Sequence, residues 1–359
     1  MTKIGVLMIQ LGTPDEPTAS AVQRYLHEFL SDPRVIETPR WKWQILLKYV
    51  ILPRRAPQSA AKYARIWDPM TGSPLLHITR LQAKALQRAL PENLVVRIGM
   101  RYGKPSIDSA VCELLAAGTD RIVVLPMYPQ YSAASTGTAC DKLFDVLRRL
   151  RFMPSIRIVP PFFADAAYIR AQASIVRAEH ARLDRPPDKI VFSFHGYPVA
   201  FVERGDPYQE QVEATTQQLA NMLRLSPNEW LLTYQSQFGR QAWIEPFTEA
   251  TLCKLAREGA RRVMIASPGF TTDCLETIDE IGRESAESFR RAGGEQLIRC
   301  PCLNDSPEWI EAMRQLILRE SLGWYPAGGQ TSDGSKQASH PNEDESTVLD
   351  VERTNERAV

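Results

Sequence analysis

The sequence has few of the features that would place the protein in a membrane, on a nucleic acid or on a nucleotide. No uninterrupted apolar run reaches the roughly 18 residues that a membrane-spanning helix needs. The 359 residues carry a formal net charge of only +1, with acids and bases interspersed, so nothing indicates a nucleic-acid partner. Neither a G-x-x-x-x-G-K-[ST] loop nor a G-x-G-x-x-G turn is present, which argues against nucleotide binding.

Cysteines with the spacing of a zinc or redox site are absent as well. The chain has no C-x-x-C pair and no recognisable secretory signal, so we expect reduced thiols and a cytoplasmic location. Cys300 and Cys302 flank Pro301 and could form a local site, but two buried thiols at a strand edge are the interpretation that we prefer. The six cysteines are Cys112, Cys140, Cys253, Cys274, Cys300 and Cys302.

Strand-like and helix-like segments alternate along most of the chain. Such alternation predicts a doubly wound parallel α/β architecture, with helices covering each sheet. The expected strands are 4–10, 95–100, 121–126, 190–195, 231–235 and 263–267. The expected helices are 20–29, 106–117, 136–149, 209–223, 249–258 and 307–321.

The two halves of the chain resemble each other, which indicates duplication of one α/β unit. Leu11-Gly12-Thr13-Pro14 follows the first strand as His195-Gly196-Tyr197-Pro198 follows a later one. Generic βαβ rhythm is the alternative explanation. We predict an N-terminal domain over 1–155 and a C-terminal domain over 156–325. The segment 326–359 is polar and lacks aromatic residues, so we expect a disordered tail.

The first half is longer than the second by roughly residues 31–76. This excess is rich in aromatic residues and predicts an insertion, a lip over a cleft, of the kind that usually carries function. No amphipathic helix is clear in it. Trp41, Trp43 and Ile45 are also candidates for contact with a membrane surface.

Two residues at predicted strand ends are candidates for chemistry. His195 ends a buried strand, and the carboxyl ends of strands face the ligand crevice in open α/β sheets. Imidazole binds iron and zinc and transfers protons near neutral pH, although a structural histidine is an equal alternative. Glu276 follows the turn after the strand 263–267 and opens a helix, where an acid also favours the helix dipole. Both residues can face one cleft if the strands share a sheet.

Other polar and aromatic residues also follow strands. Arg101, in Arg101-Tyr102, could bind a carboxylate through two hydrogen bonds. Trp243 could form one wall of a flat pocket, or belong to the core. Asp279, Glu280 and Glu284 continue from Glu276 at helical spacing and could conduct protons, guide a cation, or form a solvated face.

Taken together, the motifs resemble those of the ferrochelatase family, enzymes that insert ferrous iron into protoporphyrin. The resemblance extends to about Tyr325, and the order and spacing of the motifs are more specific than any one of them. The matching motifs are 11–15, 101–103, 125–132, 193–198, 234–239, 268–277 and 303–307.

The resemblance implies two Rossmann-like, chelatase-type domains, each a four-stranded parallel sheet flanked by helices, with the porphyrin in a cleft between them. It implies that His195 and Glu276 handle iron and protons as the catalytic and metal-binding pair, with their division of roles left open. Leu11, Tyr128 and Trp243 would contact the porphyrin, together with Arg101 and Tyr102. The substrates would be protoporphyrin IX and Fe²⁺.

Two departures from the family pattern carry further expectations. Some members hold a [2Fe–2S] cluster on cysteines, but no cysteine follows Cys302 and Ala133-Ala134 stand where one ligand can lie, so we predict no cluster and no permanently bound cofactor. A tyrosine tends to occupy the position of Leu11 in the branch that uses coproporphyrin, so leucine favours protoporphyrin. We expect a monomer, peripheral to the inner membrane face if the lip binds lipid. A non-catalytic haem or metal carrier, and a chelatase for another metal or tetrapyrrole, are the alternatives.

Overall fold

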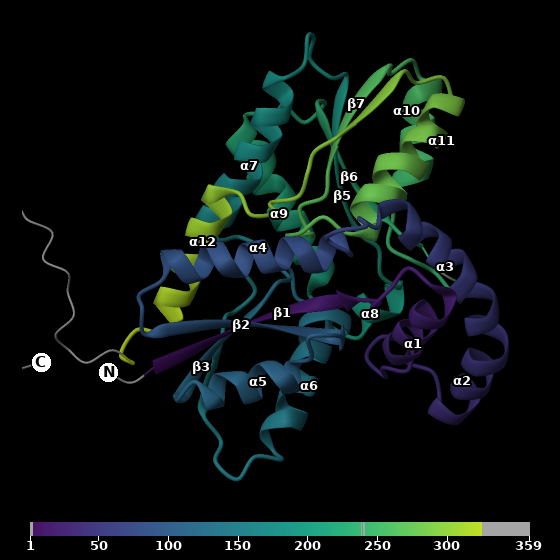
Figure 1. Ribbon diagram of the computed structural model, residues 1–359. Helices are drawn as coiled ribbons and strands as arrows, with labels where there is room; N and C mark the ends of the chain where they lie inside the picture. Colours follow the sequence, from purple (N-terminus) through teal and green to yellow (C-terminus); the bar gives the residue numbers. More distant parts are fainter. Residues whose placement is uncertain (1–2, 238, 240, 325–359) are drawn as a thin grey trace, which may run out of the picture. The chain divides into compact units, whose positions relative to one another are not determined.

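Two four-stranded parallel sheets form the framework of the protein, as the alternation of segments predicts (Figure 1). The computed structural model describes residues 3–237, 239 and 241–324, and those up to Leu322 form one unit. The expected tail at 326–359 lies outside the described residues. The strands of the first lobe are β1 (Lys3–Thr13), β2 (Leu94–Gly103), β3 (Thr119–Pro126) and β4 (Ser155–Ile158). Those of the second are β5 (Lys189–His195), β6 (Trp230–Gln235), β7 (Arg262–Ala266) and β8 (Gln296–Arg299).

Both sheets have the same topology. The spatial order is β2-β1-β3-β4 in the first lobe and β6-β5-β7-β8 in the second. Val6 on β1 lies opposite Val96 on β2 and Val123 on β3, and none of the chain from Val6 to Ile9 is exposed. A central parallel strand is covered on both faces, which is why β1 is a continuous apolar run rather than an alternating one.

Helices cover the sheets and supply most of the core. In the first lobe α5 and α6 pack against Leu7 and Ile9 of β1, while α4 contacts β1 and β2. The helices up to this point are α1 (Ala19–Leu30), α2 (Arg40–Leu46), the π-helix η1 (Leu47–Ile51), α3 (Leu52–Ile66), α4 (Pro74–Ala89), α5 (Ile107–Ala116), the π-helix η2 (Ala133–Gly137) and α6 (Thr138–Leu147). Those that follow are α7 (Ala166–Ala181), α8 (Val199–Glu203), α9 (Tyr208–Leu223), α10 (Thr248–Arg257), the π-helix η3 (Glu276–Ser285), α11 (Ala286–Arg291) and α12 (Pro307–Glu320).

The inserted segment is helical, which the sequence did not indicate. The helices α2, η1 and α3 follow one another without a break and pack against α1. Their buried side chains are Leu47, Leu52, Ala56, Ala60 and Tyr63, spaced by five, four, four and three residues. A π-turn forms i→i+5 hydrogen bonds, so η1 accommodates the five-residue step that an α-helical pattern does not allow.

The last helix, α12, returns to the first lobe. It packs against α7 and also contacts α4 and β3 (Figure 1). Trp309 is fully buried, with its ring centroid 5.7 Å from that of Phe162 and 6.3 Å from that of Tyr168. Arg157 of β4 donates hydrogen bonds to the carbonyl oxygens of Glu320 (2.7 Å) and Leu322 (2.6 Å). A cation at a helix C-terminus favours the helix dipole, so this contact stabilises the joint between the lobes.

Candidate active site

The topology of each sheet marks one place for a ligand. The chain leaves the central strand for one neighbour and then crosses to the other side, so the switch points lie between β1 and β3 and between β5 and β7. Ligands of open α/β sheets bind at the carboxyl ends of the strands at such points. Leu11 and Tyr128 lie at the first switch point. His195 ends β5 at the second, and the segment after β7 leads to Glu276.

His195 has one ring nitrogen occupied and one free for chemistry. Its Nδ1 lies 2.6 Å from the carbonyl oxygen of Gly196, which can only accept, so Nδ1 carries the proton in the neutral ring. Nε2 is then the basic nitrogen. The ring lies 5.4 Å from that of Tyr197, and Tyr208 Oη donates to the backbone carbonyl of His195 at 3.0 Å. The histidine is thus oriented to accept a proton or bind a metal through Nε2.

Trp243 packs against the turn that follows His195. A Cβ atom on Gly196 would lie 2.9 Å from the carbonyl oxygen of Gln235 and 3.3 Å from Trp243 Cε3, so only glycine fits between them. The backbone of Trp243 pairs with Pro198 in an isolated β-bridge. The buried indole Nε1 of Trp243 has no hydrogen-bond partner within the described residues. The indole is therefore close to His195 and retains a donor.

The segment that leads to Glu276 is fixed by polar contacts around Asp273. Its carboxylate accepts hydrogen bonds from Thr277 Oγ1 (2.8 Å), Arg299 Nη1 (2.7 Å) and Asn304 Nδ2 (2.8 Å). Asn304 Oδ1 in turn accepts the backbone N–H of Asp273 at 2.9 Å. Glu276, at the start of η3, takes part in none of these four bonds. Burial raises the pKa of the neighbouring Cys274 thiol, and the Glu276 carboxylate raises it further.

A buried glutamine of the first lobe also holds this segment. Gln82 of α4 donates to the carbonyl oxygens of Thr271 (3.2 Å) and Asn304 (2.8 Å) and accepts from Thr272 Oγ1 at 3.2 Å. Thr271 Oγ1 donates to the carbonyl of Met127 at 3.1 Å. The position of Glu276 relative to the first lobe is therefore set by hydrogen bonds from both lobes.

His195 and Glu276 each lie within electrostatic range of Glu280. Burial raises the pKa of Glu280, and the nearby Glu276 carboxylate raises it further. The hydrogen bond from Ser236, the charge of Lys62 and the charge of His195 act in the opposite direction. The predicted histidine and glutamate therefore both lie near the carboxyl of Glu280. Glu280 joins them.

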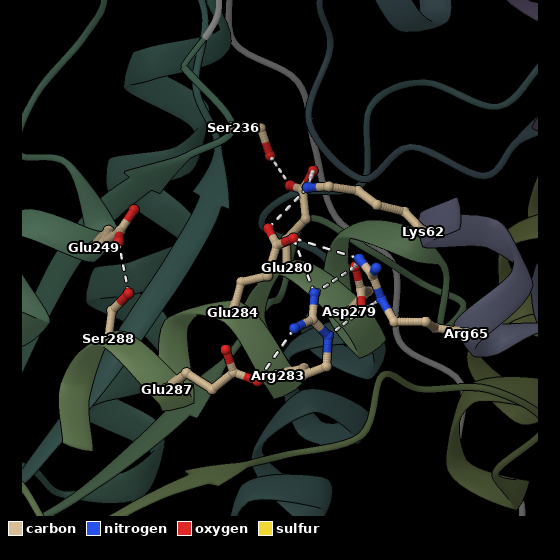
Figure 2. A network of polar contacts seen from close by, with 10 residues as sticks. All are labelled: Lys62, Arg65, Ser236, Glu249, Asp279, Glu280, Arg283, Glu284, Glu287 and Ser288. Atoms are coloured by element: carbon tan, nitrogen blue, oxygen red, sulfur yellow. Dashed lines mark hydrogen bonds and ion pairs between the residues drawn. The ribbon is translucent and has the colours of Figure 1, made fainter. Parts of the chain in front are cut away.

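The row of acids after Glu276 differs from the expectation in two ways. Residues Glu276–Ser285 form a π-helix, a rare geometry that is often found at functional sites. The row is also neither free nor simply solvated, because Lys62 and Arg65 of α3 point toward it (Figure 2). Glu284 accepts from Lys62 Nζ at 2.8 Å. The alternative of a solvated face is therefore wrong for Asp279 and Glu280, whose side chains are 1% and 26% exposed, while Glu284 is 38% exposed.

Arg101 and Tyr102 lie inside the protein rather than on an open surface. The guanidinium of Arg101 is paired with Asp32 and donates to the carbonyl oxygen of Thr138 at 3.0 Å. Tyr102 is fully buried, and its hydroxyl donates to Asp32 at 2.9 Å. Both side chains therefore have partners inside the protein, Asp32 for both and Thr138 for Arg101. Direct contact of Tyr102 with a substrate is thus at odds with this geometry.

Leu11 and Tyr128 lie on the first-lobe side. Leu11 is half-buried against the cluster formed by α1 and α3, which Leu275 also contacts. Burial raises the pKa of Tyr128, and its hydroxyl has no hydrogen-bond partner within the described part of the chain. Tyr128 is also within electrostatic range of Tyr197, the neighbour of His195. These contacts join the two lobes at the carboxyl ends of their sheets.

Sequence reasoning missed several residues of this site. Ser236, which donates to Glu280 at 2.7 Å, lies in the motif 234–239 but was given no role. Lys62 gave no signal, because it is more than 200 residues from its partners. Within the described residues, no three His, Cys, Asp or Glu side chains are arranged to bind one metal ion. None of the described helices has the length and apolarity that crossing a lipid bilayer requires.

The two sheets and the group of residues at their carboxyl ends define a chelatase-type α/β protein, which confirms the predicted fold class. A solved structure of SirB from Bacillus subtilis with Fe³⁺ has this fold, with a TM-score of 0.51 at 14% sequence identity. The match covers 90% of this chain and 96% of that one.

Comparison of sequences gives the family. The family model for ferrochelatase matches residues 3–321. Curated ferrochelatases from Bradyrhizobium diazoefficiens and from Rhodopseudomonas palustris strain BisB5 are each 47% identical over 325 residues. These matches cover 90% of this chain and 94% of each relative. The chain therefore belongs to the ferrochelatase family and is an enzyme of porphyrin metallation, as its motifs predicted.

Proposed function

We propose that this enzyme inserts Fe²⁺ into protoporphyrin IX to form protohaem, the last step of haem synthesis. The observation that carries this proposal is the ring of His195, held through Nδ1 by the Gly196 carbonyl, within electrostatic range of Glu280, which Glu276 also influences. Metallation releases two protons from pyrrole N–H groups for each Fe²⁺ bound. An imidazole base and carboxylates that carry protons away suit this stoichiometry.

The reaction divides into proton removal and metal delivery. In the first, a pyrrole N–H bond breaks and its proton forms an N–H bond at His195 Nε2 or an O–H bond at Glu276. In the second, the same two groups are the candidates to hold Fe²⁺ as it loses water and meets the porphyrin nitrogens.

The pocket is proposed to bend the macrocycle. A bent porphyrin directs its nitrogen lone pairs out of the plane, and the strain is supplied by contacts away from the reacting atoms. Leu11, Tyr128 and Trp243 are the candidates for these contacts. Arg101 acts on this proposal through Asp32 and Thr138 rather than by touching a propionate. The leucine at position 11 favours protoporphyrin over coproporphyrin.

The test is anaerobic insertion of Fe²⁺, or of Zn²⁺ as a stable substitute, into protoporphyrin by the purified protein. We expect His195→Ala and Glu276→Gln each to lower kcat by about 10²-fold or more, the usual contribution of an acid–base group. Near-normal kcat in both variants would contradict the roles that we assign to His195 and Glu276 in proton removal and metal delivery. Porphyrin binding without turnover in the unmodified protein would instead favour a haem or metal carrier.

We also propose that the lip contacts a membrane surface from the cytoplasmic side. The large apolar side chains exposed on α2 and η1 include Trp41 (67% exposed) and Tyr49 (68%). Lys42 and Lys48 lie over these rings, at 5.1 and 5.3 Å, so basic and apolar groups are interleaved as in interfacial helices. Sedimentation with anionic vesicles should fall when both aromatics become serine. Phe152→Ser, at an exposed position outside the lip, is the control.

A monomer without an iron–sulfur cluster completes the proposal. Cys274, Cys300 and Cys302 are buried, and no cysteine follows Cys302, so the chain does not supply a C-terminal ligand set for a [2Fe–2S] group. A visible iron–sulfur band after growth in iron would contradict the prediction. Analytical ultracentrifugation tests the oligomeric state.

A further inference from the structure

The lip helix α3 and the π-helix η3 meet through a row of opposite charges (Figure 2). Arg65 donates two hydrogen bonds to Asp279, at 2.9 and 2.6 Å, and Arg283 donates another at 2.7 Å. Asp279 is almost fully buried, with 1% of its side chain exposed. Its charge is therefore compensated by two guanidinium groups, which leaves the neighbouring Glu280 to other partners.

Glu280 is held from two sides. Ser236, after β6, donates to Glu280 Oε2 at 2.7 Å, and Lys62 of α3 places its ammonium 3.7 Å from Glu280 Oε1. The same ammonium donates to Glu284 at 2.8 Å. Lys62 thus bridges two carboxylates one helical turn apart, and both side chains of the Lys62–Glu280 pair are about 70% buried.

The position of Glu280 connects this charge contact to the chemistry. Its carboxyl lies within electrostatic range of Glu276 and His195, and also of Arg55 on α3. Glu280 is therefore the member of the acid row that contacts the lip through Lys62 and also lies within electrostatic range of His195 and Glu276. Movement of α3 away from η3 would remove the Lys62 ammonium from Glu280.

We propose that Lys62 is a positioning residue that fixes the carboxylate of Glu280 beside Glu276 for proton removal. This inference rests on the proposed function. A proton that leaves a pyrrole N–H for His195 or Glu276 passes to a Glu280 oxygen, where an O–H bond forms, and then to water. Lys62 holds that oxygen in place only while α3 is docked on η3, so the lip contributes to the reaction as well as covering the site.

The first experiment compares Lys62→Gln with Lys62→Arg in anaerobic Zn²⁺ insertion. A partly buried ion pair of this kind supports a loss of about five- to tenfold in kcat for Lys62→Gln. Protoporphyrin affinity, measured by fluorescence titration without metal, should stay within about twofold. Lys62→Arg keeps the charge and should recover most of kcat. A loss confined to porphyrin affinity, or no rescue by arginine, would overturn the proposal.

The second experiment asks whether Lys62 acts through Glu280. On the proposal, Lys62→Gln in a Glu280→Gln background causes no further loss, because the residue it positions is already gone. Arg65→Gln is the matched control. Arg65 contributes to the same contact between α3 and η3 but pairs with Asp279 and Glu284, so its effect should multiply with that of Glu280→Gln.

The outcomes separate the two proposals. Multiplying losses for Lys62→Gln and Glu280→Gln, or a Glu280→Gln variant with full kcat, would refute the role of Lys62 while metallation stands. Absence of turnover in the unmodified protein would refute the proposed function itself. Lys62→Met, which keeps the apolar stem, replaces Lys62→Gln if circular dichroism shows that the glutamine variant does not fold.

Discussion

Replacement of Asp279 by asparagine is expected to lower the free energy of unfolding by about 2 kcal/mol at pH 7. Burial opposes ionisation of this carboxyl, but Arg65 and Arg283 lower its pKa from 3.8 to about 2. One pKa unit corresponds to about 1.4 kcal/mol, so the ionised form contributes about 2.4 kcal/mol at most. Both arginines are more than one-third exposed, so solvent screening reduces the figure to about 2 kcal/mol.

The pH dependence follows from the direction of the shift. The folded pKa of Asp279 lies below the unfolded value, so its contribution is complete above the unfolded pKa and is lost as the pH falls through about 2. The difference between the unmodified protein and Asp279→Asn should therefore shrink on acidification, to about half its neutral value at pH 3.

Urea unfolding followed by circular dichroism at pH 7 and pH 3 measures both quantities. Glu258→Gln, in the largely exposed Lys254–Glu258 pair, is the control and should change the free energy by less than about 0.5 kcal/mol. A difference for Asp279→Asn below about 0.5 kcal/mol at pH 7 would refute the argument, as would a difference of equal size at both pH values.

Three further changes test other parts of the structure. Gly12→Ala should prevent folding, because at φ +112° its Cβ would lie 1.8 Å from the Tyr102 carbonyl oxygen. Gly118→Ala is the control: this glycine also has a positive φ but lies in open space, so the variant should lose only about 1 kcal/mol of stability in thermal melts. Tyr102→Phe should lower the free energy of unfolding by about 1 kcal/mol through the lost bond to Asp32 and leave the porphyrin KM unchanged; a raised KM would restore Tyr102 as a substrate contact. Gln82→Leu leaves a buried carbonyl of Thr271 and a partly buried carbonyl of Asn304 without this donor, so it should cost about 2 kcal/mol and lower kcat. An unaltered kcat would show that the segment before η3 holds its position without Gln82.

The central strands could be predicted from the sequence because burial on both faces makes them continuous apolar runs. The edge strands β4 and β8 were missed. Each has four residues and includes an arginine, Arg157 or Arg299, that binds groups outside the sheet. A short strand with one paired side gives little hydrophobic signal, so its place becomes clear only beside its neighbour.

The helical lip could not be predicted for a different reason. The step from Leu47 to Leu52 breaks the period of an α-helix, and Pro53 and Pro57 follow. Pro53 lies in the first turn of α3, where its missing N–H is tolerated, and the π-turn absorbs the extra residue. A pattern with one α-helical period therefore assigns this segment to a loop.

The site was predicted where strand ends determine it and missed where distant charges do. His195 ends β5 and Glu276 lies after the neighbouring strand β7, so the sequence could place both beyond the carboxyl ends of one sheet. Arg101 and Tyr102 also follow a predicted strand, but β2 continues through them and Asp32, about 70 residues earlier, turns both inward. No local pattern reveals such a partner.

The return of α12 to the first lobe bears on how the protein is made. The first lobe's sheet is complete once β4 has been synthesised, but α4 and β3 receive their contact with α12 only after residues 307–320 leave the ribosome. Domains usually fold as units in the order of their synthesis. A nascent chain stopped before Pro307 would therefore leave uncovered the parts of α4 and β3 that α12 contacts, together with the rings of Phe162 and Tyr168 on which Trp309 packs.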